Sequence, residues 1–185
     1  MQLMNANESL LLVIDIQEKL LPAIHAQEVM LKHCQWLLRL ADTFKVPVFI
    51  SEQYPQGLGH TPKSLLDVAP TAASLEKLEF SCAANLAMLN ALEHYNRQQI
   101  IICGIETHVC VMQTAIDLAN LGKQVYIVED ATDTRFQEDK YWAIQRMNRH
   151  ENIQIVTHEM VLFEWLKQSG TALFKEVSKK FLKET

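Results

Sequence analysis

The segment Leu10-Leu11-Leu12-Val13-Ile14-Asp15 decides the fold class. Five consecutive apolar residues of this kind fit a strand that is buried on both faces, as the strands of parallel sheets are. Four other apolar runs rich in branched side chains have the same character. They span residues 46–50, 100–103, 125–128 and 153–156. A shorter, less regular strand is expected within residues 73–80.

Segments with helical spacing lie between these strands. Met30, Cys34, Leu37, Ala41 and Phe44 recur every three or four residues, which places one apolar stripe against a sheet. Further helices are expected after a cap at Ser81, from Thr107 to Gly122, and over residues 137–150, 158–167 and beyond Gly170. Alternating strands and helices require right-handed crossovers and a parallel sheet. We therefore expect one three-layer α/β/α domain over residues 1–185.

Composition and charge exclude several classes of protein. The 185 residues carry 17 Lys and Arg against 22 Asp and Glu, a net charge of −5. No basic block is present that would neutralise a run of phosphates, so we expect no nucleic acid partner. The apolar runs are too short to span a bilayer, so we expect no membrane partner. The four cysteines form no C-x-x-C pair or zinc-finger pattern, which predicts reduced thiols in the cytoplasm.

Three positions are candidates for chemistry, because open parallel sheets bind ligands beyond the carboxyl ends of their strands. Asp15 ends the first strand. Cys110 lies in the first turn of the helix after the strand at 100–103, where the helix dipole lowers the pKa of a thiol and backbone amides can hold an oxyanion. Lys77 follows a short strand-like stretch. Each residue alone also has an ordinary interpretation: Asp15 as a cap, Cys110 as a core residue and Lys77 as a solvated charge.

Three longer motifs contain these positions: Leu11-Leu12-Val13-Ile14-Asp15-Ile16-Gln17-Glu18, the Lys77 segment and Gly104-Ile105-Glu106-Thr107-His108-Val109-Cys110. Two further motifs accompany them: Ser51-Glu52-Gln53-Tyr54-Pro55 with Gly57-Leu58-Gly59, and Val128-Glu129-Asp130-Ala131-Thr132-Asp133. Over nearly the whole chain this pattern resembles the isochorismatase-like (cysteine hydrolase) family. Within the family it is most similar to the isochorismatase domain-containing proteins.

The resemblance implies a Rossmann-like hydrolase fold with a six-stranded parallel sheet and an Asp-Lys-Cys triad of Asp15, Lys77 and Cys110. In this triad Asp15 moves the thiol proton to the leaving group, and Lys77 pairs with Asp15 and favours the thiolate. Cys110 attacks a carbonyl to form a thioester that water resolves. The resemblance also implies a cis peptide bond between Ile105 and Glu106, with the backbone N–H groups of Glu106 and Cys110 as oxyanion hole.

The chain also departs from parts of the superfamily. Nicotinamidases hold a metal through an Asp-x-His pair and a further His after the second strand, where this chain has Ser51-Glu52-Gln53 and His60 alone. We therefore expect no metal, and keep a nicotinamidase-type amidase without the metal site only as an alternative. The isochorismatases proper usually lack the cysteine, so Cys110 argues against vinyl ether cleavage. No arginine cluster is present for substrates with a free carboxylate, although Arg135 fits the pocket mouth.

Family-like segments and strand ends suggest the pocket walls, which we expect to be Gln17, Tyr54, Phe80, Ile105 and Phe136. Gly57-Leu58-Gly59 lacks the context of a dinucleotide fingerprint and is expected to be a loop. His108 is two helical positions from Cys110 and should point away from it. We interpret His108 as a pocket or subunit contact, or as a plain surface residue.

The sequence thus predicts a cysteine hydrolase that cleaves a small amide or related acyl compound, without metal or organic cofactor. The family expectation is a cytoplasmic homo-oligomer, and the helix after Cys110 and the C-terminal amphipathic piece fit either a dimer surface or a core. One rival is a catalytically weak interaction module on the same fold. Another is a thiol-redox protein that pairs Cys110 with Cys103, which would require rearrangement.

Overall fold

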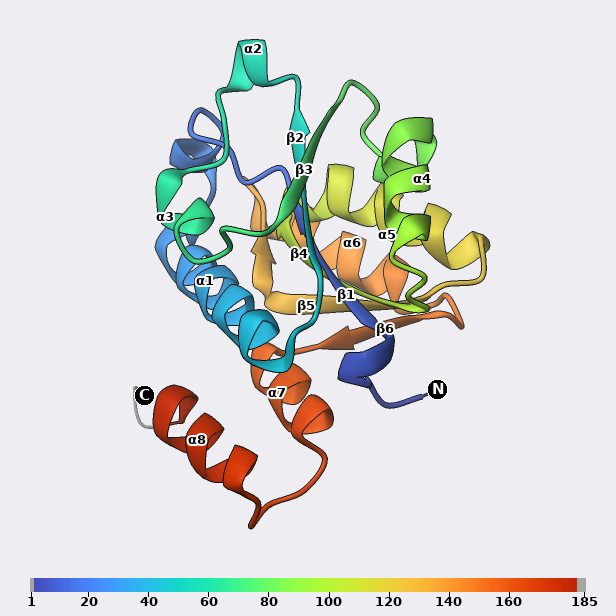
Figure 1. Ribbon diagram of the computed structural model, residues 1–185. Coiled ribbons are helices and arrows are strands. Elements are labelled where there is room, and N and C mark those ends of the chain that lie inside the picture. The colour runs from blue at the N-terminus through green and yellow to red at the C-terminus, as the bar shows by residue number, and fades with distance from the viewer. Residues whose placement is uncertain (1, 183–185) are drawn as a thin grey trace.

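The computed structural model describes residues 2–182 and contains one six-stranded parallel sheet in the order β3-β2-β1-β4-β5-β6 (Figure 1). The strands are β1 (Ser9–Ile14), β2 (Val48–Gln53), β3 (Ala73–Lys77), β4 (Gln99–Ile105), β5 (Gln124–Asp133) and β6 (Ile153–Val156). The expected three-layer α/β/α architecture is confirmed. The weakly patterned strand expected within 73–80 is β3, which lies at the edge of the sheet.

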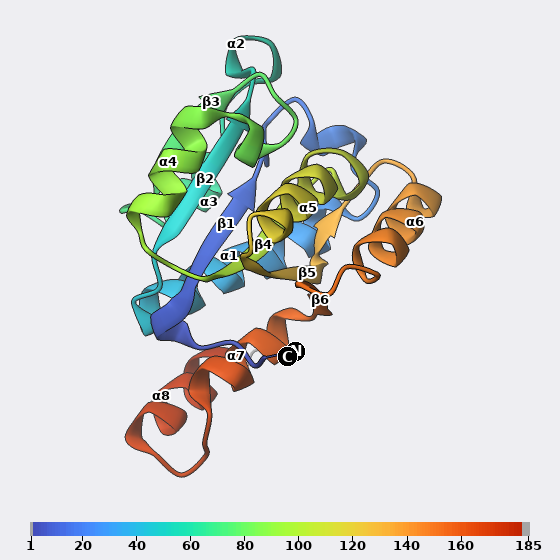
Figure 2. The ribbon, with the colours of Figure 1, turned by 90° about the vertical axis from the view of Figure 1, so that its right-hand side faces the viewer.

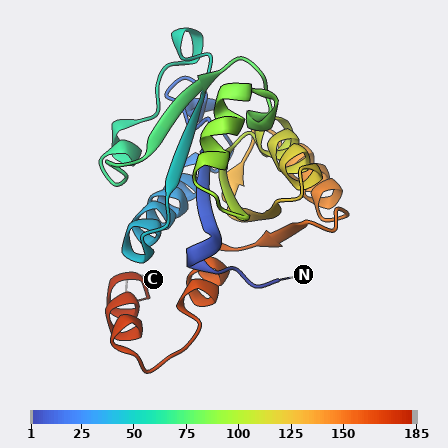
Figure 3. The same ribbon diagram turned by 45° about the vertical axis from the view of Figure 1, so that its right-hand side comes forward.

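Helices cover both faces of the sheet (Figures 2 and 3). One face carries α1 (Gln27–Phe44), α3 (Lys63–Leu66), α7 (His158–Leu166) and α8 (Ala172–Phe181). The other carries α4 (Leu86–His94), α5 (Met112–Asn120) and α6 (Gln137–Met147). Short turns complete the chain: η1 (Ala6–Glu8), η2 (Leu21–Ala23), η3 (Cys82–Ala84), and the short α2 (Pro55–Leu58). Among the described residues, no helix combines the length and apolarity needed to cross a membrane.

The alternation of side chains along β1 explains the two cores. Leu11 and Val13 face α1 and α7, whereas Leu10, Leu12 and Ile14 face α4, α5 and α6, and all five are fully buried. Burial of both faces is what a continuous apolar run indicates. The C-terminal amphipathic piece is α8, whose buried Val177 and Phe181 belong to the core on the α1 face rather than to a free surface.

The local expectations differ from the structure at three places. Ser81 caps η3, not the longer helix, because Asn85 accepts the Met88 N–H and caps α4. The helix from Thr107 begins with a π-helical turn, η4 (Thr107–Val111), before α5. Gly57 and Leu58 belong to the single turn α2 instead of a loop.

Gly104 sits where the order of the strands reverses, between β1 and β4. Its φ is +118°, and a Cβ at this position would lie 2.1 Å from the carbonyl oxygen of Ile14. Only glycine tolerates both the conformation and the close backbone approach. Gly104 therefore holds the end of β1, directly before Asp15, against the end of β4. Ligands of open α/β sheets bind at this kind of switch point.

Candidate active site

Asp15 follows β1 in a left-handed conformation with φ of +50°. Strict alternation along an extended strand would send its side chain to the α1 face, because Leu11 and Val13 point there. The left-handed residue ends this alternation, while the Asp15 N–H donates to the carbonyl of Ser51 at 3.1 Å. A non-glycine residue with positive φ is uncommon and is often found at functional sites. The backbone thus turns Asp15 toward the end of β2.

The Asp15 carboxylate is buried, and each of its oxygens accepts a hydrogen bond. Lys77 Nζ donates to Oδ2 at 2.6 Å, and Ser51 Oγ donates to Oδ1 at 2.7 Å. The Asp15 and Lys77 side chains are 1% and 0% exposed. Burial would lower the pKa of Lys77, but the charge and hydrogen bond of Asp15, together with the nearby Cys110 and Cys82, raise it above the ordinary value. Lys77 is therefore a buried ammonium group and not a solvated charge.

Gln53 connects Lys77 with Cys110. Its Oε1 lies 2.6 Å from Lys77 Nζ and 4.0 Å from Cys110 Sγ. Gln53 and Lys77 are register partners on β2 and β3, so their side chains leave the sheet side by side on one face. Ser51 and Gln53 are site residues that the sequence analysis missed, since it treated them only as substitutes for a metal motif. Their two-residue spacing at the end of a strand could have identified them, because residues two apart on a strand point to the same face.

Cys110 lies in η4 on the α4 face of the sheet, near the buried pair, and is 6% exposed. Burial and the negative charge of Asp15 raise the pKa of its thiol well above the ordinary value, and Lys77 offsets only part of this rise. The expectation that the helix terminus lowers this pKa was wrong in its direction. At neutral pH the sulfur is a thiol with Asp15 close enough to accept its proton.

Glu106 is held on the other side of η4. The Ile105–Glu106 peptide bond is cis, as expected. Glu106 Oε2 accepts hydrogen bonds from Thr134 Oγ1 at 2.9 Å and Arg135 Nε at 3.0 Å. Burial would raise the pKa of Glu106, but these hydrogen bonds and the charge of Arg135 lower it. The Arg135 cation is therefore matched by a carboxylate of this chain.

His108 belongs to the same network. Its Nδ1 lies 2.7 Å from Thr134 Oγ1, and its ring is 23% exposed. It is therefore a partly buried partner of Thr134 rather than a plain surface residue.

The five expected pocket residues occupy different surroundings. Gln17 is fully buried, and Ile105 lies in the core on the α1 face, opposite Cys110, so neither has the place of a pocket wall. Gln17 instead acts as a clamp: its Nε2 donates to the carbonyls of Gln53 and Gly59, and its Oε1 accepts the Gln53 N–H. Tyr54, Phe80 and Phe136 are 51%, 53% and 61% exposed.

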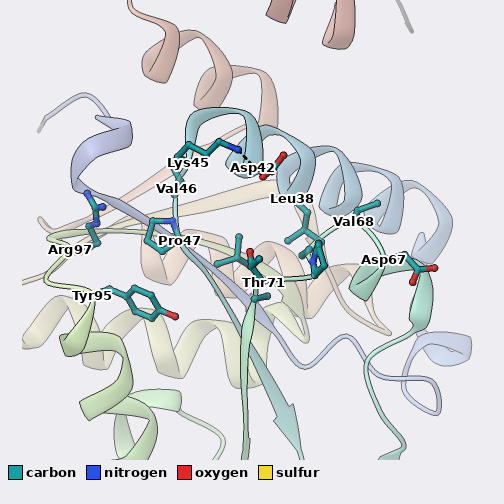
Figure 4. Close-up of a pocket in the computed structure, with 14 residues that line it drawn as sticks. Leu38, Asp42, Lys45, Val46, Pro47, Asp67, Val68, Thr71, Tyr95 and Arg97 are labelled. Atoms are coloured by element: carbon teal, nitrogen blue, oxygen red, sulfur yellow. Dashed lines mark hydrogen bonds and ion pairs between the residues drawn. The ribbon is translucent and has the colours of Figure 1, made fainter.

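Two cavities lie along β2, at opposite ends. Tyr54 and Lys77 help to line a cavity of about 390 Å³ at the carboxyl ends of β2 and β3. A larger cavity of about 620 Å³ lies at the start of β2, bordered by Pro47, Thr71 and Tyr95 (Figure 4). A six-residue strand is about 17 Å long, so the larger cavity is remote from the triad.

The region that would hold a metal in a nicotinamidase does not fit one. Ser51 and Gln53 bond to Asp15 and Lys77. Glu52 accepts from the N–H of Thr61 at 2.7 Å and lies 3.0 Å from His60 Nδ1. Hydroxyl and carboxamide groups replace the ligands, and the remaining acid and imidazole bond to each other.

A second group of possible ligands, His33, Asp130 and His158, brings its ligand atoms within 4.8 Å of one another. The two rings stack at 4.2 Å with 21° between their planes, so their nitrogen lone pairs lie in two nearly parallel planes. Both Nδ1 atoms already contact Asp130 at 2.6 Å. This group ties α1, β5 and α7 together on the face opposite Cys110.

The remaining cysteines have structural surroundings. Cys34, Cys82 and Cys103 are fully buried, and burial raises the pKa of Cys82 to about 11. Cys103 faces α1 while Cys110 faces α4, so the sheet separates the two sulfurs. A disulfide between them does not fit this fold, which removes the geometric basis of the thiol-redox alternative.

The comparisons with known proteins agree with these observations. The sequence family described as the isochorismatase domain matches residues 9–160. Isochorismatase domain-containing protein 2 of Danio rerio is 33% identical over 171 residues, which are 92% of this chain and 85% of that relative.

Two solved structures share the fold. The MAR1 ribonuclease of Caenorhabditis elegans is 32% identical with a TM-score of 0.90, over 98% of this chain and 93% of that one. The YcaC gene product of Escherichia coli, described as an octameric hydrolase of unknown specificity, is 22% identical with a TM-score of 0.90. That likeness covers all of this chain and 93% of the other.

Proposed function

This chain belongs to the isochorismatase family, and we propose that it is a cysteine hydrolase that cleaves a small amide or related acyl compound through a thioester on Cys110. The observation that carries the proposal is the buried contact of 2.6 Å between Lys77 Nζ and Asp15 Oδ2 beside the Cys110 sulfur. Burying a charged pair costs desolvation free energy, and buried ionisable groups of this kind are concentrated at functional sites.

In the first half of the proposed reaction Cys110 Sγ attacks the substrate carbonyl. Asp15 accepts the thiol proton as the C–S bond forms, because the pKa of Cys110 is too high for a standing thiolate at neutral pH. The backbone N–H groups of Glu106 and Cys110 would hold the oxyanion. When the C–N bond breaks, Asp15 passes the proton to the leaving amine, and the acyl group stays on sulfur.

In the second half water attacks the thioester. Asp15 accepts a proton from this water, and the C–S bond breaks to release the acid and return the proton to sulfur. Lys77 remains protonated throughout and limits the build-up of negative charge beside Asp15. The proposed steps use residues of this chain and one water molecule.

We further propose a neutral substrate instead of a carboxylate. Near the site, Lys77 is matched by Asp15 and Arg135 by Glu106. The cavity beside Tyr54 also contains Glu76 and Glu79. An anionic substrate in this cavity would therefore meet two acidic side chains, and Lys77, the lysine among the residues that line it, is already paired with Asp15. RNA hydrolysis, which the description of the Caenorhabditis elegans protein names, is not favoured here for the same reason and because the chain carries a net charge of −5.

We also propose that the chain is a cytoplasmic homo-oligomer. The description of the Escherichia coli neighbour as octameric supports assembly. Phe136, Tyr141 and Trp142 at the start of α6 are more than half exposed, an unusual state for three large apolar side chains so close together. The four free cysteines agree with a reducing compartment. Light scattering of the purified protein tests the assembly.

The experiment that tests the proposed activity is a screen of amides, ureides and hydroxamates against the wild type and Cys110→Ala. Turnover by the wild type alone supports the hydrolase. A wild type that turns over none of the panel, and whose Cys110 alkylates no faster than Cys34 or Cys82, favours the interaction module.

A further inference from the structure

Gln53 is a partly buried polar side chain that the proposed reaction does not use. It ends β2 and has no apolar packing role, since both ends of its carboxamide are engaged in hydrogen bonds. Its Nε2 donates to the carbonyl of Leu78 at 2.8 Å, which leaves Oε1 pointing to Lys77. The orientation of the amide is thereby fixed, because a flipped amide would place NH₂ against the ammonium group.

The backbone of Gln53 is held as firmly as its side chain. Gln17 accepts the Gln53 N–H at 2.7 Å and donates to the Gln53 carbonyl at 3.0 Å. Gln17 is itself fully buried and follows Asp15 by two residues. The side chain of Gln17, which follows β1, therefore holds both the N–H and the carbonyl group of Gln53 at the end of β2. An arrangement of this kind holds a functional group in one position.

The oxygen of Gln53 has two neighbours that matter for the chemistry. Lys77 Nζ donates to it at 2.6 Å, and Cys110 Sγ lies 4.0 Å from it. The other acceptor of Lys77 is Asp15 Oδ2. With two fixed acceptors, Asp15 Oδ2 and Gln53 Oε1, the ammonium group has one position, whereas with Asp15 alone it could turn around a single contact.

We propose that Gln53 is a positioning residue that holds the Lys77 ammonium group beside the Cys110 sulfur, and that it acts through Lys77 instead of touching the substrate. This inference rests on the proposed function, because it matters only where Cys110 reacts. It also assigns Gln17 as the support of Gln53, which explains why a fully buried glutamine spends its three hydrogen bonds on backbone groups.

The test uses Gln53→Met, which keeps the length of the side chain and removes the acceptor, and Gln53→Glu, which keeps the acceptor and adds a charge. The rate of Cys110 alkylation by iodoacetamide is measured against pH on the intact protein, with the labelled residue identified by peptide mass. Gln53→Met should slow Cys110 labelling at pH 7 by about tenfold or more, as expected for one pKa unit. Gln53→Glu should move the midpoint further toward high pH, because its carboxylate faces the developing thiolate.

The matched control is Gln98→Met. Gln98 is an exposed glutamine before β4 whose Nε2 also donates to a backbone carbonyl, that of Gly122, at 2.6 Å. Its loss should leave the alkylation profile of Cys110 unchanged. Melting temperatures of all variants separate a loss of structure from a loss of positioning, and Gln53→Leu, which also lacks the acceptor, keeps the test available if Gln53→Met unfolds.

The outcomes separate the two proposals. A wild type that turns over none of the amide panel, or Cys110→Ala that turns it over at the wild-type rate, overturns the proposed function itself. A wild type that turns over an amide, with folded Gln53 variants that keep the wild-type pH profile of Cys110 alkylation, overturns the role of Gln53 and leaves the hydrolase intact. A purely structural role would lower melting temperature without moving that profile.

Discussion

Asp15 and Lys77 are 62 residues apart in the sequence, yet Lys77 Nζ lies 2.6 Å from Asp15 Oδ2 with both side chains buried. They meet because β1 and β3 flank β2, and because all three strands end at the same edge of a parallel sheet. Cys110 reaches this edge from β4 on the other side of β1. The switch in strand order therefore places the sulfur and the ion pair together.

Asp15→Asn separates the two effects of the carboxylate. Its negative charge raises the pKa of Cys110, so its removal should move Cys110 alkylation to lower pH. Turnover should nevertheless be lost, because the base is gone. A pH profile of alkylation beside an amide assay measures both. The unpaired Lys77 should also cost about 3–5 kcal/mol of unfolding free energy, which urea unfolding detects. Normal turnover by folded Asp15→Asn would contradict the assignment of the base.

His108→Ala should keep most of the turnover. His108 contacts Thr134, but Glu106 retains its hydrogen bonds from Arg135, both side chain and backbone, without the histidine. The measurement is kcat and KM on the same amide as the wild type. A loss as deep as that of Cys110→Ala would instead make His108 a catalytic residue.

Gly104→Ala should destabilise the protein by at least about 2 kcal/mol. The new Cβ meets the Ile14 carbonyl oxygen, which belongs to the backbone and has no room to move away. Gly170→Ala is the matched control, since Gly170 also has positive φ but no neighbouring atom within 4 Å of its added Cβ. Urea unfolding of both variants isolates the clash from the conformational strain. Equal losses would show that close approach of β1 and β4 is unimportant.

Asp130 should make the free energy of unfolding fall at acidic pH. Burial would raise its pKa, but hydrogen bonds from the ring and backbone of His158 outweigh this and lower it. A lowered pKa in the folded state means stability that is present above the ordinary carboxyl pKa of about 4 and is lost as pH falls through the folded value. Asp130→Asn should therefore be less stable than the wild type at pH 6, with a difference that shrinks below about pH 4. A difference that is constant with pH would contradict this role.

Much of the fold could be predicted because the deciding features are local. Five predominantly apolar runs indicate buried parallel strands regardless of their partners, and each lies within or overlaps a strand of the structure, with β5 extending furthest beyond its expected end. The order of the strands and the identity of β3 depend on crossovers and on pairing with β2, which alternation in the sequence does not contain. The sixth strand was expected from the weakly patterned stretch 73–80, and the family resemblance implied a sheet of six strands.

The motifs also predicted which residues to consider as a triad, but they did not predict the burial and the neighbouring groups that set the Cys110 pKa. The sequence places Cys110 at the start of a helix and so suggests an acidic thiol, whereas burial and Asp15 act in the opposite direction. Ser51 and Gln53 became visible as site residues only through the register that sets them beside Ile14 and Lys77. The full burial of Gln17 and Ile105 could not be read from the motifs, because the side-chain direction after a strand depends on backbone turns that no motif encodes.

The thioester on Cys110 is tested most directly by intact-protein mass spectrometry of wild type and Cys110→Ala, acid-quenched during turnover of an amide from the screen. We expect a wild-type population heavier by the acyl group, located on the Cys110 peptide and removed by hydroxylamine, and no such population in Cys110→Ala. Turnover in which no acyl adduct forms, or which Cys110→Ala performs at the wild-type rate, would contradict a covalent mechanism on this sulfur.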